Sequence, residues 1–343
     1  MLLSRRHTLS LGLGIGAERL LSRSISFAHA QNSSQNHTAA SGPKTKVGVN
    51  VAGAEFGDLE GKKNFQYVYA DNNYINWCLD QGFTIIRLPF SWPRLMPSID
   101  DRALRMGDFE EVQRIAKVCT ARGAVCLLDM HNYGRYRGKP LGYQSIPTEF
   151  FALTWQLIAA GLQGQNVWFG LMNEPHDQDM DKAMAQFQMA ADAIRKTGHI
   201  GRILVPSGGW SGAHAFVGGG NVPRFQSLKI PGDWSVELHQ YLDANNSGTN
   251  HSVHVAGKGA SILKECTAAL AENNWTAILG ELGWSDSADG NREGEDLVSS
   301  MHQRPDVWIA HTYWSSGPWW GDYPYAIGPN KKNGQLSVLQ KFM

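Results

Sequence analysis

Two glutamates lie at the ends of short apolar runs that have the composition of buried strands. Glu174 belongs to Val167-Trp-Phe-Gly-Leu-Met-Asn-Glu-Pro175, and Glu281 belongs to Ala277-Ile-Leu-Gly-Glu-Leu-Gly283. A carboxylate at the rim of an apolar strand is costly to desolvate, so chemistry explains it more readily than packing does. Two carboxylates on separate strand ends are what cleavage of a glycosidic bond requires: one protonates the leaving oxygen, and the other acts across the anomeric carbon.

The elements that must position these glutamates form a regular alternation from residue 46 onward. Helical patterns, among them 71–81, 108–122, 181–197 and 262–273, separate apolar runs at 47–53, 84–90, 124–132, 167–175, 202–208, 235–241, 276–283 and 308–314. Eight strands alternating with helices predict an α/β fold, a single (β/α)8 TIM barrel over residues 46–343. An open doubly wound sheet would also alternate. However, residues 51–57 lack the glycine-rich phosphate turn typical of that fold.

The C-terminal ends of parallel barrel strands share one mouth, where active sites lie. At the fourth and seventh strand ends, Glu174 and Glu281 are expected to face each other at roughly the 5–5.5 Å separation of retaining glycosidases. We predict that Glu174 is the acid/base. Glu281 would be the nucleophile, kept ionised by Arg87 and the Tyr241 hydroxyl.

Other strand ends carry polar or aromatic residues with a predicted supporting role: His131, Asn132, Asn173, His239, Trp210 and Trp314. His131 and His239 are suited to bond substrate hydroxyls or to tune Glu174, and Trp314 offers a flat face for a pyranose ring. Taken singly, the histidines and Trp314 are equally well explained as core residues, and Arg87 as a barrel ion pair. Their convergence on one mouth favours function.

Taken in order, these residues make the chain resemble glycoside hydrolase family 5, the retaining cellulase-type barrels. That family has an Arg, a His, an Asn-Glu pair, a His-x-Tyr, a Glu and a Trp. The set is met here by Arg87, His131, Asn173-Glu174, His239-Gln240-Tyr241, Glu281 and Trp314. The resemblance extends from about residue 46 to the C-terminus.

Three segments, 129–136, 238–249 and 319–323, look closer to the endo-β-1,4-glucanases of the fifth subfamily. The resemblance implies internal hydrolysis of β-1,4-glucan with retention, without metal or cofactor, and substrate contacts from Trp210 and Trp319. The alternatives are the same mechanism on mannan, xyloglucan or mixed-linkage glucan, and an inactive carbohydrate-binding barrel. Retention of both carboxylates argues against the inactive barrel.

The N-terminus has the features of an export signal. Arg5 and Arg6 precede a Leu/Gly-rich stretch, and Ala28-His29-Ala30 offers a small-x-small cleavage site. We therefore expect a twin-arginine-like signal at residues 1–30, a polar leader at 31–45, and a secreted or periplasmic bacterial protein. A flexible cytoplasmic tail is the alternative.

Composition excludes several classes of partner. The formal charge is zero, so a nucleic-acid footprint is not expected, and no apolar stretch is long enough for a membrane span. The four cysteines form no C-x-x-C pair, which argues against a metal knuckle; disulfides and buried free thiols both remain open. We expect a monomer whose partner is a polysaccharide, and the 12 tryptophans suit sugar faces, although most should be core residues.

Overall fold

A computed structural model describes residues 44–251 and 255–343. The expected signal at 1–30 and the leader up to residue 43 lie outside this described region. Within the described residues, no helix combines the length and apolar character that a membrane crossing needs.

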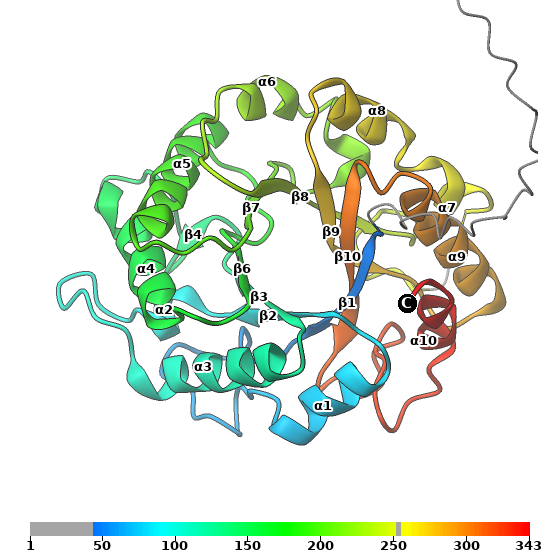
Figure 1. The fold of residues 1–343 in the computed structure, drawn as a ribbon, viewed down its shortest axis with the longest axis horizontal. Helices are drawn as coiled ribbons and strands as arrows, with labels where there is room; N and C mark the ends of the chain where they lie inside the picture. The colour runs from blue at the N-terminus through cyan, green and yellow to red at the C-terminus, as the bar shows by residue number, and fades with distance from the viewer. Residues whose placement is uncertain (1–43, 252–254) are drawn as a thin grey trace, which may run out of the picture. The chain divides into compact units, whose positions relative to one another are not determined.

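Eight parallel strands close into a barrel, as predicted, and helices form a ring around it (Figure 1). The barrel strands are β1 (Lys46–Val51), β2 (Ile85–Phe90), β3 (Val125–Met130), β6 (Val167–Gly170), β7 (Ile203–Pro206), β8 (Trp234–Tyr241), β9 (Ala277–Gly283) and β10 (Trp308–Ser316). Each barrel strand pairs with the next barrel strand along the chain, so β3 pairs with β6. β1 closes the ring on β10, with Lys46 opposite Ala310.

The helices fill the connections between strands. They are α1 (Asn72–Asp80), α2 (Trp92–Leu95), α3 (Met106–Ala121), α4 (Thr148–Gly161), α5 (Met180–Lys196), α6 (Asn221–Gln226), α7 (Lys258–Ser261), α8 (Lys264–Glu272), α9 (Ala288–His302) and α10 (Gly334–Leu339), with 3-10 turns η1 (Ala213–Ala215) and η2 (Gln340–Phe342). A short hairpin, β4 (Arg135–Tyr136) and β5 (Lys139–Pro140), lies outside the barrel sheet.

Two strands end earlier than their apolar runs do. β6 stops at Gly170 and β7 at Pro206, whereas the runs continue to 175 and 208. Leu171 and Met172 are fully buried although they follow β6, so the run reports burial beyond the end of the regular strand. Glu174 consequently lies in the loop beyond β6, not on the strand itself.

The core has two layers. Inside the barrel, six apolar side chains form a separate cluster: Ile85, Val125, Leu127, Leu204, Ile278 and Ala310. A larger cluster lies between the strands and the surrounding helices. Cys78, Cys119, Cys126 and Cys266 are all buried free thiols, which decides the question that their spacing left open.

One close contact fixes α9 against the barrel. Trp284 is fully buried, its indole lies edge-on to Tyr313 of β10 at 5.0 Å, and the Tyr313 hydroxyl donates to the Trp284 carbonyl oxygen at 3.0 Å. A Cβ atom at Gly294 of α9 would lie 2.2–2.6 Å from the Trp284 ring. Only glycine therefore lets α9 approach this close.

We predict that Gly294→Ala destabilises the fold by about 1–3 kcal/mol, because the new methyl group overpacks a buried indole. Gly107→Ala in α3 is the matched control. Its Cβ would meet nothing within 4 Å, so helix propensity should leave stability unchanged or raise it by up to about 1 kcal/mol. Denaturant unfolding measures both variants; equal stabilities would contradict this packing account.

Candidate active site

Arg87 lies at the centre of the barrel mouth with its side chain fully buried. Its guanidinium donates to Glu281 Oε1 at 3.0 Å and to Glu237 Oε1 at 3.2 Å, and lies 3.1 Å from Asp129 Oδ1. It also donates to the amide oxygens of Asn50 at 2.7 Å and Asn173 at 3.0 Å. Such pairing is what makes burial of a charged side chain tolerable. The carboxylates raise the pKa of Arg87 against the effect of burial, so it is a permanent cation.

Glu281 is held as a carboxylate. Besides its bond to Arg87, Oε2 accepts a 2.5 Å hydrogen bond from the Tyr241 hydroxyl. Burial alone would raise the pKa of Glu281, but the positive charges of His239 and Arg87 outweigh it and lower the pKa to about 2. Arg87 and Tyr241 therefore lie where the sequence predicted them, on the charge they were expected to stabilise.

Glu174 is in the opposite electrostatic situation. Burial and the negative charge of Glu281 raise its pKa, and the hydrogen bond and charge of His239 only partly offset them. His239 Nδ1 lies 2.8 Å from Glu174 Oε1. Glu174 also has a left-handed backbone, with φ of +41°, a conformation that costs a non-glycine residue about 1–3 kcal/mol. The loop after β6 therefore aims this side chain at the expense of backbone strain.

The separation of the two glutamates decides between glycosidase geometries. Glu174, His239 and Glu281 each offer an atom within 4.8 Å of the other two. Inverting enzymes hold their carboxyl groups roughly 6.5–9.5 Å apart to admit water, and retaining enzymes hold them at about 5–5.5 Å. Carboxylate oxygens within 4.8 Å of each other are compatible with the closer, retaining geometry.

The same three side chains are close enough together to suggest a metal site. However, the Glu281 oxygens already accept bonds from Arg87 and Tyr241. Glu281 and Glu174 outweigh the effect of burial on His239 and raise its pKa to about 10. The imidazolium form has no lone pair for a metal. We therefore do not regard these residues as metal ligands.

His131, Asn173 and Asn132 follow the strand ends as predicted. His131 Nδ1 lies 2.7 Å from Asp129 Oδ2, and Asn173 Nδ2 lies 3.3 Å from His131 Nε2. Because Arg87 donates to the Asn173 side-chain oxygen, the Asn173 amide nitrogen must face His131 Nε2. His131 Nε2 then accepts a hydrogen bond, which favours the His131 tautomer protonated at Nδ1. Asn132 instead accepts from the backbone N–H of Trp92 at 2.5 Å, a contact that anchors α2.

Four tryptophans differ in how far their rings are exposed. Trp314 is 8% exposed and stacks on the His131 ring, with centroids 5.5 Å apart and 17° between planes. Trp320 packs edge-on against Trp314 at 5.5 Å. Trp319 and Trp210 are 44% and 49% exposed. Trp319 and Trp210 therefore expose aromatic surface that a ligand could reach, as does Tyr133, which lines the cleft described next.

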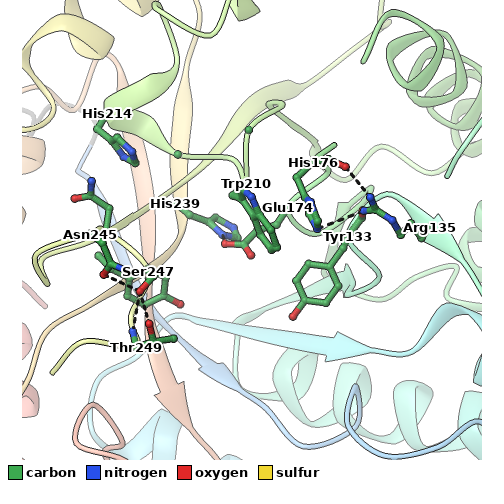
Figure 2. A pocket seen from close by; sticks show the side chains of 14 residues that line it. Tyr133, Arg135, Glu174, His176, Trp210, His214, His239, Asn245, Ser247 and Thr249 are labelled. Carbon is green, nitrogen blue, oxygen red and sulfur yellow. Dashed lines mark hydrogen bonds and ion pairs between the residues drawn. The ribbon is translucent and has the colours of Figure 1, made fainter. Parts of the chain in front are cut away.

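A cleft of about 910 Å³ adjoins Glu174 and His239 (Figure 2). Trp210 stacks directly on His176, with centroids 3.4 Å apart, and Arg135 donates to the His176 carbonyl oxygen at 3.0 Å. The opposite side of the cleft is a loop carrying Asn245, Asn246, Ser247 and Thr249. The buried Asp243 carboxylate shapes this loop by accepting from the backbone N–H groups of Gly248, Thr249 and Asn250. Polar and aromatic groups thus face each other across a groove beside Glu174.

Three buried or half-buried polar residues were missed from the sequence: Asn50, Glu55 and Glu237. Glu237 and His239 are two residues apart on β8, so period-two alternation would have placed Glu237 on the inner face. Burial raises the pKa of Glu55 to about 7, partly offset by His131, and its Oε2 accepts from the Gly53 N–H at 2.7 Å. Asn50 is a polar residue inside an apolar strand, so its position in the sequence could also have identified it.

Comparison with known proteins agrees with this geometry. The family model for cellulase, glycosyl hydrolase family 5, matches residues 45–318. The chain belongs to glycosyl hydrolase family 5. Endo-beta-1,4-glucanase A of Emericella nidulans is 33% identical over 84% of this chain and 88% of its own length. The endoglucanase gh5-1 of Neurospora crassa is 32% identical over 86% and 75%.

Solved family 5 structures have the same fold. XacCel5A in complex with cellopentaose superposes with a TM-score of 0.83 at 32% identity, covering 88% of this chain and 99% of that one. The endo-beta-1,4-glucanase Xac0029 from Xanthomonas axonopodis pv. citri gives a TM-score of 0.82 at 31% identity, covering 87% and 98%. The predicted family and barrel are therefore confirmed.

The Tyr241 hydroxyl provides a test of the Glu281 environment. Tyr241→Phe removes a donor to the charged form, so the pKa of Glu281 should rise from about 2 by about one unit. Glu281 would then become protonated at a higher pH than in the wild type. Carboxyl ¹³C NMR titration measures this directly.

Tyr325→Phe is the matched control, because Tyr325 is equally buried and its hydroxyl has no hydrogen-bond partner among the described residues. An unchanged Glu281 titration in Tyr241→Phe would contradict the assigned hydrogen bond.

Proposed function

We propose that this family 5 chain is a retaining endo-β-1,4-glucanase in which Glu174 is the acid/base and Glu281 the nucleophile. The observation that carries the proposal is a close pair of carboxyl groups with opposite pKa shifts, raised for Glu174 and lowered for Glu281. A proton donor and an ionised nucleophile are thereby available at the same pH.

In the first step, a Glu281 oxygen attacks the anomeric carbon while the glycosidic C–O bond breaks. Glu174 transfers its proton to the departing oxygen, which leaves as a sugar hydroxyl. The product is a glycosyl ester on Glu281, with Glu174 as a carboxylate. Arg87 and Tyr241 bond Glu281 in its ground state, so they aim the attacking oxygen as well as keep it charged.

The second step uses the loss of charge at Glu281. Once it is an ester, the negative charge that raised the pKa of Glu174 is gone, so that pKa falls and Glu174 is left as the carboxylate that the second step needs as a general base. Glu174 removes a proton from water, the water oxygen attacks the anomeric carbon, and the ester bond to Glu281 breaks. Both residues return to their starting forms, and two inversions give net retention.

β-1,4-Glucan is the proposed substrate because two of the relatives named above are endo-β-1,4-glucanases at 30% identity or more. The predicted contacts are Trp314 beside the catalytic pair and Trp210 and Trp319 at the exposed surface. Product sizing on soluble β-glucan, β-mannan, xyloglucan and mixed-linkage glucan distinguishes this substrate from the alternatives. Preferential cleavage of mannan would refute the glucan assignment.

We further propose that residues 1–30 direct export from a bacterial cell and that the catalytic protein acts outside the cytoplasm as a monomer. The support is the Arg5-Arg6 pair and the cleavage site before Gln31. Replacing both arginines by lysine should leave the uncleaved precursor in the cytoplasm of a bacterial host. Cell fractionation with size analysis measures this, and normal export of that variant would exclude a twin-arginine signal.

Glu174→Gln and Glu281→Gln should each lower kcat on soluble β-1,4-glucan by roughly 10²-fold or more, since each removes one essential proton or electron-pair transfer. Glu272→Gln, an exposed residue of α8, is the control and should retain wild-type turnover. Wild-type activity in either catalytic variant would refute the proposal.

Azide separates the two roles. With an activated aryl cellobioside, azide should rescue Glu281→Ala and give the α-glycosyl azide, because it attacks from the side of the missing nucleophile. Rescue of Glu174→Ala should give the β-azide by attack on the ester. NMR of the products gives the anomeric configuration. A β-azide from Glu281→Ala and an α-azide from Glu174→Ala would mean that the two roles are assigned the wrong way round.

A further inference from the structure

Glu237 is a buried carboxylate that the proposed mechanism does not use. It lies on β8 two residues before His239, and its side chain is 1% exposed. Its Oε1 lies 3.1 Å from Arg87 Nη2 and accepts from Arg87 Nε at 3.2 Å. The mechanism assigns no substrate contact to it, so a role must come from its neighbours.

The barrel makes specific room for this carboxylate. A Cβ atom at Gly280 of β9 would lie 2.3 Å from Glu237 Oε1, and one at Gly170 of β6 would lie 3.1 Å from Oε2. Both glycines belong to the strand segments that precede the catalytic glutamates. Side chains at either position would displace Glu237, so the fold keeps this space for it.

His239 lies between three carboxylates. Its Nδ1 is 2.8 Å from Glu174 Oε1 and 3.6 Å from Glu281 Oε2, and its Nε2 is 3.9 Å from Glu237 Oε1. His239 Nε2 and Glu237 Oε2 have no hydrogen-bond partner among the described residues. The ring therefore faces the acid/base on one side and Glu237 on the other.

The charges around His239 favour its protonated form. His239 contacts Glu237 on its own strand, Glu281 on β9 and Glu174 after β6. Further titratable groups of the mouth are Arg87, Asp129, His131, Tyr241, Glu55, Tyr133 and His214. Arg87 is one cation shared by three carboxylates. A second cation is needed to balance them, and His239 is placed to be it.

We propose that Glu237 is a positioning residue that holds His239 as an imidazolium and, through it, sets the pH range in which Glu174 exchanges its proton. This inference rests on the acid/base role proposed for Glu174. Burial by itself would lower the pKa of His239, but Glu281, Glu174 and Glu237 together raise it to about 10. The imidazolium offsets the repulsion from Glu281 and keeps Glu174 able to release its proton in the first step.

The wild-type protein provides a test that does not depend on the folding of a Glu237 variant. At pH 8, ¹⁵N NMR should show His239 with both ring nitrogens protonated, its signals being assigned by their loss in His239→Gln. A neutral His239 ring at pH 8 would overturn the proposal. This measurement is independent of hydrolysis, so it holds even where the assignment of Glu174 fails.

Glu237→Gln provides the kinetic test. Removing one negative charge lowers the proton affinity of the coupled Glu174–His239 pair. The basic limb of the plot of kcat/KM against pH should therefore move to lower pH by about one unit. Glu237→Asp retains the charge and should restore most of the shift. Glu293→Gln is the control for loss of a buried carboxylate: Glu293 accepts from the Gly257 and Gly259 N–H groups, and its variant should keep the wild-type profile.

A folded Glu237→Gln protein with reduced kcat but an unmoved basic limb would show that Glu237 only packs, and would overturn the proposal. Failure of the proposed function looks different. The wild-type protein would then show no hydrolysis of β-1,4-glucan at any pH, whereas the His239 titration would still report on Glu237.

Discussion

The buried guanidinium of Arg87 is the interaction on which the rest of the mouth depends. It makes contact with carboxylates on β3, β8 and β9, and with the amide of Asn50 on β1. Removing one partner of a buried ion pair typically costs about 3–5 kcal/mol, because the remaining charge stays desolvated. Here a single cation is shared by three carboxylates, so each depends on the others for its charge and position.

This arrangement explains how two chemically identical side chains acquire opposite pKa shifts. Glu281 receives Arg87 and the Tyr241 hydroxyl, and its pKa falls to about 2. Glu174 receives neither; it receives burial and repulsion from Glu281, and its pKa rises. The different environments originate in the fold, because Glu281 lies on a paired strand next to Arg87, whereas Glu174 lies on a strained loop beyond β6.

Arg87 also positions the side chains around the two glutamates. Arg87 orients the Asn173 amide, which in turn faces His131, and His131 supports the ring of Trp314. The position of the aromatic face therefore depends on the charge cluster through one continuous set of contacts. A substitution at Arg87 would consequently affect substrate placement as well as nucleophile charge.

Sequence alone predicted the barrel, the glutamate pair and their partners Arg87 and Tyr241, because strand ends in a parallel barrel share one mouth. It did not predict where β6 ends, since a buried apolar run has the same composition in a strand and in the segment after it. It also missed Glu237, whose role depends on space left by glycines on two other strands. The shape of the 245–249 loop could not be predicted from the sequence either, because it depends on hydrogen bonds from backbone N–H groups to the buried Asp243 carboxylate.

The role proposed for Glu281 is that of an ionised nucleophile that forms a covalent ester with the sugar. An activated 2-deoxy-2-fluoro-β-cellobioside tests it most directly, because the fluorine slows hydrolysis of the ester and lets it accumulate. Mass spectrometry of the intact protein and of its peptides should find one added cellobiosyl group, carried by Glu281. A label on another residue, or full turnover of the reagent without any labelled protein, would contradict the account.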